Sequence, residues 1–119
     1  MRSDAGQVDD LWTRTLLPQF LDLTASRQIE IDIERGNLEA GDDPFVSTQE
    51  IGKIAHKIAG TAASFGFVTL GAQAQTVESI CKHICGLSDG QAKEAVSHQL
   101  FPALDLLSQE LDLALVTSA

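Results

Sequence analysis

The fold is decided by residues 51–84, which read IGKIAHKIAGTAASFGFVTLGAQAQTVESICKHI. Wound as a helix at roughly 100° per residue, the first part of this stretch gathers its apolar side chains on one face. The second part repeats apolar residues at four-three-four-three spacing, the pattern of another helix with one buried face. The turn Phe65-Gly66-Phe67 between them is so short that the second helix must fold back antiparallel. The expected core residues are Ile51, Ile54, Ala55, Ile58, Ala62 and Phe65, followed by Leu70, Ala74, Val77, Cys81 and Ile84.

Upstream of this hairpin, the sequence predicts a short helix and then a long one. The short helix is expected through Val8–Leu16, and the long one from about Leu17 to Arg35, with its end at Gly36-Asn37. Pro18 fits either the first turn of the long helix or a kink. Residues 28–34 alternate apolar and charged side chains, as a strand does. A helix is preferred there because no partner strand is visible and a lone strand is unstable in water.

The helix that carries His56 follows a loop of turn-forming residues, 36–44. Ser47 or Thr48 is predicted to cap this helix, because a hydroxyl side chain can accept a hydrogen bond from the free backbone N–H groups of a first turn. Glu50, three residues after Ser47, would complete a capping box. The His56 helix is therefore expected to begin near residue 47.

The last helix is expected from about Asp89 to Val116. It contains Pro102, which predicts a kink or a short break between His98 and Phe101. Four long helices with short connections imply an all-α, up-down-up-down four-helix bundle, with the short N-terminal helix packed across one end. Residues 1–119 are expected to form one such domain. The core residues expected from the last helix are Val96, Leu100, Ala103, Leu104, Leu107, Leu111 and Leu115.

The composition favours an aliphatic helical domain without nucleic-acid or membrane partners. Hydrophobic residues make up 44% of the 119 residues, but aromatic residues only 5%. Eight Lys and Arg against seventeen Asp and Glu give a net charge of −9, which argues against nucleic acid and anionic membranes as partners. No apolar run approaches the length of a membrane span or a signal peptide core. The cytoplasm is therefore the expected compartment, and a monomer is expected because no large exposed apolar patch is apparent.

The two cysteines, Cys81 and Cys85, lie four residues apart on a predicted helix. Their side chains project from the same flank, which is poor geometry for a disulfide. With His83 they form a C-x-H-x-C pattern of metal-ligand residue types. Because His83 points roughly opposite to the cysteines on a helix, the three cannot share one ion, and no metal site is predicted.

His56 is the candidate functional residue, because small residues surround it. On the helical wheel it points about 150° away from the centre of the apolar stripe. Its neighbours on the helix surface are Gly52, Ala59, Gly60 and Ala63. A glycine costs about 1 kcal/mol relative to alanine inside a helix, and both glycines lie off the apolar stripe. Close approach of another protein to His56 explains them better than close helix packing does.

Charged residues are expected on both sides of this histidine. Lys53 and Lys57 bring positive charge to its flank within an acidic chain and would stabilise an anion held on the ring. The neighbouring helix places Glu78 and Lys82 beside its apolar stripe. Glu78 is expected to accept a hydrogen bond from one ring nitrogen and so leave the other as a nucleophile. An ordinary surface ion pair between Glu78 and Lys82 is the alternative.

The residues around His56 resemble the histidine-containing phosphotransfer (HPt) domain family of multistep two-component signalling. The family pattern is a His, a small or basic residue three positions on, Gly and Ser/Thr at the next two positions, another Gly near the helix end, and then a Leu-containing amphipathic helix. Many members have Lys three positions after the His, where this chain has Ala59, so Lys57 or Lys53 is expected to substitute. The matching positions here are His56, Ala59, Gly60, Thr61, Gly66 and Leu70.

The resemblance implies that His56 takes a phosphoryl group from the aspartyl phosphate of one receiver domain and passes it to a receiver aspartate on another protein. The chain would be a phosphocarrier rather than an autonomous enzyme, served by response-regulator receiver domains and a hybrid sensor histidine kinase. Mg²⁺ is expected on the receiver, and no cofactor on this chain. Lys82 would reach the phosphoryl group. A non-catalytic helical module that binds a receiver or kinase without being phosphorylated is the alternative. The receiver is expected to dock on Gly52, Ala59, Gly60, Ala63, Phe67 and Val68.

Overall fold

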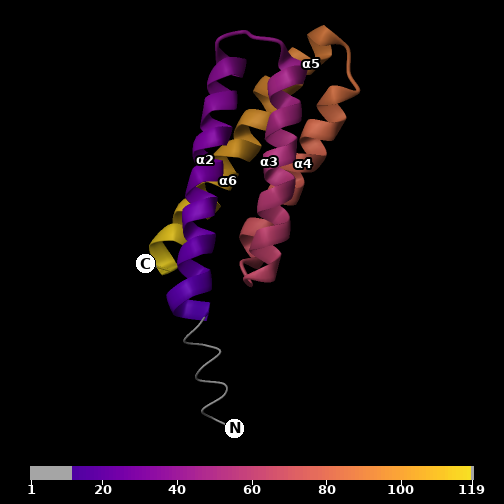
Figure 1. The fold of residues 1–119 in the computed structure, drawn as a ribbon. Coiled ribbons are helices and arrows are strands. Elements are labelled where there is room, and N and C mark those ends of the chain that lie inside the picture. Colours follow the sequence, from indigo (N-terminus) through magenta and orange to yellow (C-terminus); the bar gives the residue numbers. More distant parts are fainter. Residues whose placement is uncertain (1–11, 119) are drawn as a thin grey trace.

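The helical hairpin predicted from residues 51–84 lies at the centre of the fold. In the computed structural model, which describes residues 12–118, α3 (Pro44–Ser64) and α4 (Val68–Cys85) run antiparallel and share the most extensive contact between any two described elements (Figure 1). The predicted core residues of both helices are buried, apart from the half-buried Phe65. Gly66 has a φ of 81°, which permits the chain to reverse between the helices.

The long helix before the hairpin, α2, spans Leu17–Glu39 and is longer than predicted. Its predicted end at Gly36-Asn37 is wrong, because Gly36 keeps a helical conformation and the left-handed residue is Gly41, with a φ of 87°. The alternating segment 28–34 is helical, as predicted, with Ile31 buried on the inner face. The apolar and charged alternation there therefore does not mark a strand.

The first four residues of the short N-terminal helix predicted over residues 8–16 lie outside the described residues, which begin at Trp12. The part that is described, η1 (Trp12–Leu16), is a π-helical segment that leads directly into α2. Pro18 lies in the first turn of α2, directly after this π-helical segment. The chain is helical without a break from Trp12 into α2.

The His56 helix, α3, begins about one turn earlier than predicted. Asp43 is its N-cap, and its Oδ1 accepts a hydrogen bond of 2.8 Å from the backbone N–H of Phe45. Pro44 occupies the first helical position, where its fixed φ favours a helix start. The predicted cap at Ser47 or Thr48 is therefore wrong, and both side chains are buried in the second turn.

The last helix is divided into α5 (Asp89–Ala95), a π-helical turn η2 (Val96–Leu100) and α6 (Phe101–Ser118). The π-helical turn is closed by a hydrogen bond from the N–H of Phe101 to the carbonyl oxygen of Val96, five residues back. Because Pro102 has no N–H to give to the helix, this wide turn accommodates it without breaking the chain of helical residues. The predicted core positions along these segments are buried, except Leu115, which is half-buried.

The helices pack in a closed arrangement of neighbours. Both α2 and α4 pack against α3 and α6, and neighbouring helices run in opposite directions (Figure 1). The described residues thus form the predicted all-α, up-down-up-down four-helix bundle, and they contain no strand. None of the helices in residues 12–118 combines the length and apolar character that crossing a lipid bilayer requires.

Three aromatic rings fix α2 against the turn between α3 and α4. The ring of Phe20 on α2 is buried and stacks on Phe65 at a centroid distance of 4.7 Å. It also stacks on Phe67 at 4.9 Å, so rings from both sides of Gly66 enclose it. Stacked aromatic pairs of this kind contribute about 0.5–1.5 kcal/mol each beyond their area burial. This stack sets the position of α2 along the His56 helix.

Candidate functional site

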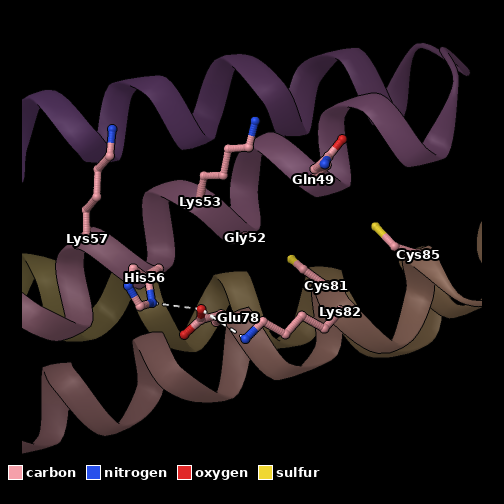
Figure 2. Close-up of a pocket in the computed structure, with 9 residues that line it drawn as sticks. All are labelled: Gln49, Gly52, Lys53, His56, Lys57, Glu78, Cys81, Lys82 and Cys85. Carbon is pink, nitrogen blue, oxygen red and sulfur yellow. Dashed lines mark hydrogen bonds and ion pairs between the residues drawn. The ribbon is translucent and has the colours of Figure 1, made fainter.

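His56 lies on the outer face of α3, about midway along the helix. Its neighbours Ala55 and Ile58 are buried in the core, whereas 74% of the His56 side chain is exposed. The ring leans toward α4, as Figure 2 shows. The helix therefore holds the imidazole firmly at its base while a partner can reach its outer edge.

Glu78 on α4 binds the inner edge of this ring. The Nδ1 atom of His56 is 2.8 Å from Oε2 of Glu78, and only 17% of the Glu78 side chain is exposed. A carboxylate can only accept a hydrogen bond, so Nδ1 carries a proton, and the lone pair of the neutral ring lies on Nε2. Figure 2 shows the second ring nitrogen on the side that faces away from Glu78. Nε2 is thus the ring nitrogen that Glu78 does not contact.

Lys82 completes a row of three charged or titratable side chains with His56 and Glu78. Its Nζ atom lies 3.4 Å from the same Glu78 Oε2 atom that contacts His56 (Figure 2). The Lys82 side chain is 77% exposed. Glu78 therefore lies beside the ring as expected, and Lys82 forms with it the i,i+4 ion pair that was the alternative.

Lys53 and Lys57, in contrast, point away from the ring. In Figure 2 both side chains extend from the opposite flank of α3. Nζ of Lys53 pairs with Oε1 of Glu50 at 3.3 Å. Neither ammonium group lies beside His56 in this arrangement, so the expectation that one of them replaces the cation absent at Ala59 finds no support in their placement.

Two of the small residues around His56 serve the contact between α3 and α4. A Cβ atom added to Gly52 would lie 3.1 Å from Cβ of Cys81, which is tighter than ordinary packing. Ala59 is only 6% exposed, and its carbonyl oxygen would lie 3.6 Å from a Cβ atom at Gly71. The interpretation of Gly52 as clearance for a partner is therefore corrected: close helix packing explains Gly52, and Ala59 is buried in the same interface.

The other predicted docking residues divide into exposed and half-buried positions. Gly60 and Ala63 are exposed, and no atom lies within 4 Å of a Cβ atom added to Gly60. Val68 is 75% exposed. Phe67 is half-buried because it stacks on Phe20. The accessible small-residue surface therefore extends from His56 toward the C-terminal end of α3.

An open groove of about 580 Å³ adjoins His56 on the other side, between α3 and α4. Cys81 and Cys85 line it together with Gly52, and both cysteines are free thiols. Burial raises the pKa of Cys81 to about 12, with smaller contributions from Cys85 and Glu78. The Cys81 thiol is therefore neutral and unreactive at physiological pH. Within residues 12–118, no group of three or more His, Cys, Asp or Glu side chains is arranged to hold a metal ion.

Arg27, which lines one surface recess together with His56, is a residue that sequence reasoning missed. It lies on the inward-facing side of α2, between the buried Thr24 and Ile31. Its Nη1 atom donates hydrogen bonds to the carbonyl oxygen of Lys57 at 3.1 Å and to Oγ1 of Thr61 at 3.0 Å. The only signal in the sequence is an arginine on the apolar side of a predicted helix, which does not reveal what it faces.

Comparison with known protein families decides the identity of the domain. The model of the Hpt domain family matches residues 16–115, which cover nearly all of the described chain. The chain belongs to the Hpt domain family. Hpt domains carry out phosphotransfer in phosphorelay signalling and generally interact with receiver domains and kinases. Neither the curated proteins nor the solved structures that were compared with this chain gave a match.

Proposed function

We propose that this Hpt domain relays a phosphoryl group between receiver-domain aspartates through His56. The observation that carries this proposal is the 2.8 Å contact between His56 Nδ1 and Glu78 Oε2 on a histidine that is 74% exposed. The contact fixes the tautomer of the ring, and the exposure presents Nε2 to a partner. His83 and His98 are exposed as well, but no hydrogen bond to a carboxylate of the described chain holds either ring.

The chemical step follows from the tautomer. The lone pair on Nε2 attacks the phosphorus of a receiver's aspartyl phosphate, an N–P bond forms, and the P–O bond to the aspartate breaks. The aspartate leaves as a carboxylate and the His56 ring becomes positively charged, so charge balances without loss of the Nδ1 proton. Glu78 stabilises that positive ring through the hydrogen bond to Nδ1. The reverse attack by a second aspartate returns the ring to its neutral state.

The receiver is expected to supply the rest of the reaction site. Phosphoryl transfer needs in-line positioning and neutralisation of charge on the transferred group, and Mg²⁺ on the receiver would provide that neutralisation. Gly60 and Ala63, exposed beside His56, leave room for the receiver to approach the ring. Val68, at the start of α4, extends this surface. Response-regulator receivers and a hybrid sensor histidine kinase are the proposed partners.

The direct test is transfer from a phosphorylated receiver domain in the presence of Mg²⁺. We expect acid-labile, base-stable phosphate on the wild type and none on His56→Gln. His83→Gln and His98→Gln are matched controls, because both histidines are exposed, and both variants should be labelled like the wild type. Receivers that bind the protein without labelling it would contradict the proposal and favour a scaffold function.

Replacing Glu78 with glutamine is expected to slow this transfer by about 10- to 100-fold, the range seen when the partner that orients a metal-binding histidine is removed. The amide keeps the shape of the side chain but loses the negative charge that stabilises the phosphorylated ring. Single-turnover transfer from a labelled receiver measures the effect. Glu94→Gln, the same change at an exposed position on α5, is the control and should transfer at the wild-type rate. An unchanged rate in Glu78→Gln would remove Glu78 from the mechanism.

A further inference from the structure

A second recess adjoins His56 on the side away from Glu78. It is an open recess of about 420 Å³ between α2 and the C-terminal half of α3. The residues that line it are Arg27, His56, Lys57, Gly60, Thr61, Ser64 and Phe65. Because Glu78 holds Nδ1, the nucleophilic Nε2 atom is on the other edge of the ring, away from Glu78 (Figure 2). A group attached to Nε2 would therefore lie on the side of the ring away from Glu78, and Arg27 lines the recess there.

Arg27 is the cation that α2 contributes to this recess. One nitrogen of its guanidinium group, Nη1, is fixed by the Lys57 carbonyl oxygen and by Thr61 Oγ1. Thr61 is itself held in place, because its hydroxyl donates to the Lys57 carbonyl oxygen at 2.8 Å. No hydrogen bond within the described chain is assigned to the Nε and Nη2 atoms of Arg27. A guanidinium group with one fixed nitrogen and further donors available is well suited to bind phosphoryl oxygens.

We infer that Arg27 binds the phosphoryl group on His56 and serves as the phosphate-side cation of this domain, with Thr61 as the residue that positions it. This inference rests on the proposed function of His56. It assigns this task to Arg27 because the ammonium groups of Lys53 and Lys57 extend away from the ring in Figure 2, although Lys57 also lines the recess.

The surroundings of Arg27 agree with binding of an anion. The side chain is half-buried, and burial lowers the pKa of Arg27, with the nearby Glu30 acting in the opposite direction. A partly desolvated guanidinium group gains more from a new anionic partner than a fully hydrated one does. No hydrogen bond or ion pair joins Arg27 to a carboxylate in the described chain, in contrast to Arg35 on the same helix, which binds Glu39 and Asp105.

The first test compares Arg27→Gln with Arg35→Gln, the same loss of charge four residues before the end of α2. Transfer from a phosphorylated receiver is followed to equilibrium. We expect Arg27→Gln to lower the ratio of phosphohistidine to phosphoaspartate by about 10-fold, as the loss of one charge-assisted contact implies, and Arg35→Gln to leave it unchanged. Arg27→Lys, which retains the charge without the fixed geometry, should fall between them. Equal ratios in all variants would overturn the inference.

The second test uses the wild-type protein alone, without a receiver and without a substitution that could affect folding. Phosphoramidate, a small phosphoryl donor, is used to label His56 directly, and the side-chain N–H signals of Arg27 are followed by NMR. We expect the Arg27 signals to shift on phosphorylation and those of Arg35 to stay in place. Unmoved Arg27 signals would overturn the inference, as would failure of phosphoramidate to label His56, because Nε2 would then not be accessible.

The two tests separate this inference from the proposed function. If no receiver transfers phosphate but phosphoramidate labels His56 and the Arg27 signals shift, the relay function fails and the phosphoryl contact of Arg27 stands. If receivers label His56 but the Arg27 signals and the equilibrium ratio do not respond, the relay function stands and the role of Arg27 fails.

Discussion

Replacing Gly60 with glutamine is expected to reduce transfer from a phosphorylated receiver by about 100-fold or more. Gly60 is exposed one turn from His56, and nothing lies within 4 Å of a Cβ atom placed there. The longer side chain therefore fits the isolated domain but occupies the space that a receiver needs to bring its aspartyl phosphate in line with Nε2. A displacement of about 1 Å can cost a factor of 100 in rate. Single-turnover transfer kinetics measure the loss.

The fold should tolerate this change, so a loss of transfer can be attributed to impaired docking of the receiver rather than to a loss of stability. Glutamine is favoured over glycine inside a helix by somewhat less than 1 kcal/mol, so the free energy of unfolding of Gly60→Gln should equal or exceed that of the wild type. Gly36→Gln is the matched control, because Gly36 is also helical, exposed and without neighbours within 4 Å of a Cβ atom. It should transfer normally. Transfer by Gly60→Gln at the wild-type rate would show that the receiver approaches His56 from another side.

Replacing Ile58 with alanine is expected to lower the free energy of unfolding by about 2–5 kcal/mol, the usual range for a large-to-small change in a core. Ile58 is 1% exposed on the inner face of α3, two residues after His56. Small domains are stable by about 5–15 kcal/mol, so the loss is a large part of the total. Urea denaturation followed by circular dichroism measures it.

An isoleucine on the outer face provides the comparison. Ile33 on α2 is 61% exposed, and Ile33→Ala should change the free energy of unfolding by less than about 0.5 kcal/mol. Both substitutions remove the same atoms from a helix, so the difference between them reports burial alone. Similar losses at both positions would mean that the helical face assigned to the core is wrong.

The sequence predicted helices well where a regular apolar pattern spans several turns. In α3 and α4 the pattern of core residues is dense, and nearly every predicted position is buried. In α2 the pattern is weaker, because Ile29 and Ile33 face solvent while Ile31 faces the core. There the choice of helix over strand depended on the absence of a partner strand rather than on the local pattern. It was nevertheless confirmed.

Helix ends were harder to predict, because several residues compete for the same role. Ser47 with Glu50 has the spacing of a capping box, yet Asp43 followed by Pro44 starts α3 about one turn earlier. Gly36 was expected to end α2, but the helix continues to Glu39 and the chain turns at Gly41. Which of the candidate residues begins or ends a helix depends on how far the helix packs against the core of the bundle.

The site could be predicted in part. Glu78 was found because it lies on the flank of a neighbouring helix whose register follows from its own apolar stripe. The packing role of Gly52 was missed because it depends on how closely α4 approaches, with Cys81 directly opposite. Arg27 was missed because its hydrogen-bond partners on α3, Lys57 and Thr61, lie 30 and 34 residues away in the sequence. No local pattern reports such contacts.

The aromatic stack at the end of the bundle determines how precisely Arg27 is positioned along α3. Phe20 and Arg27 are seven residues apart on α2, which corresponds to about 10 Å along the helix axis. Since Phe20 is enclosed by Phe65 and Phe67, α2 cannot slide along α3 without separating the rings. A shift of one helical turn would carry Arg27 about 5.4 Å along the axis, beyond the reach of Thr61. The three stacked rings therefore determine where, two helical turns further along α2, the Arg27 guanidinium group lies in the recess that it shares with His56.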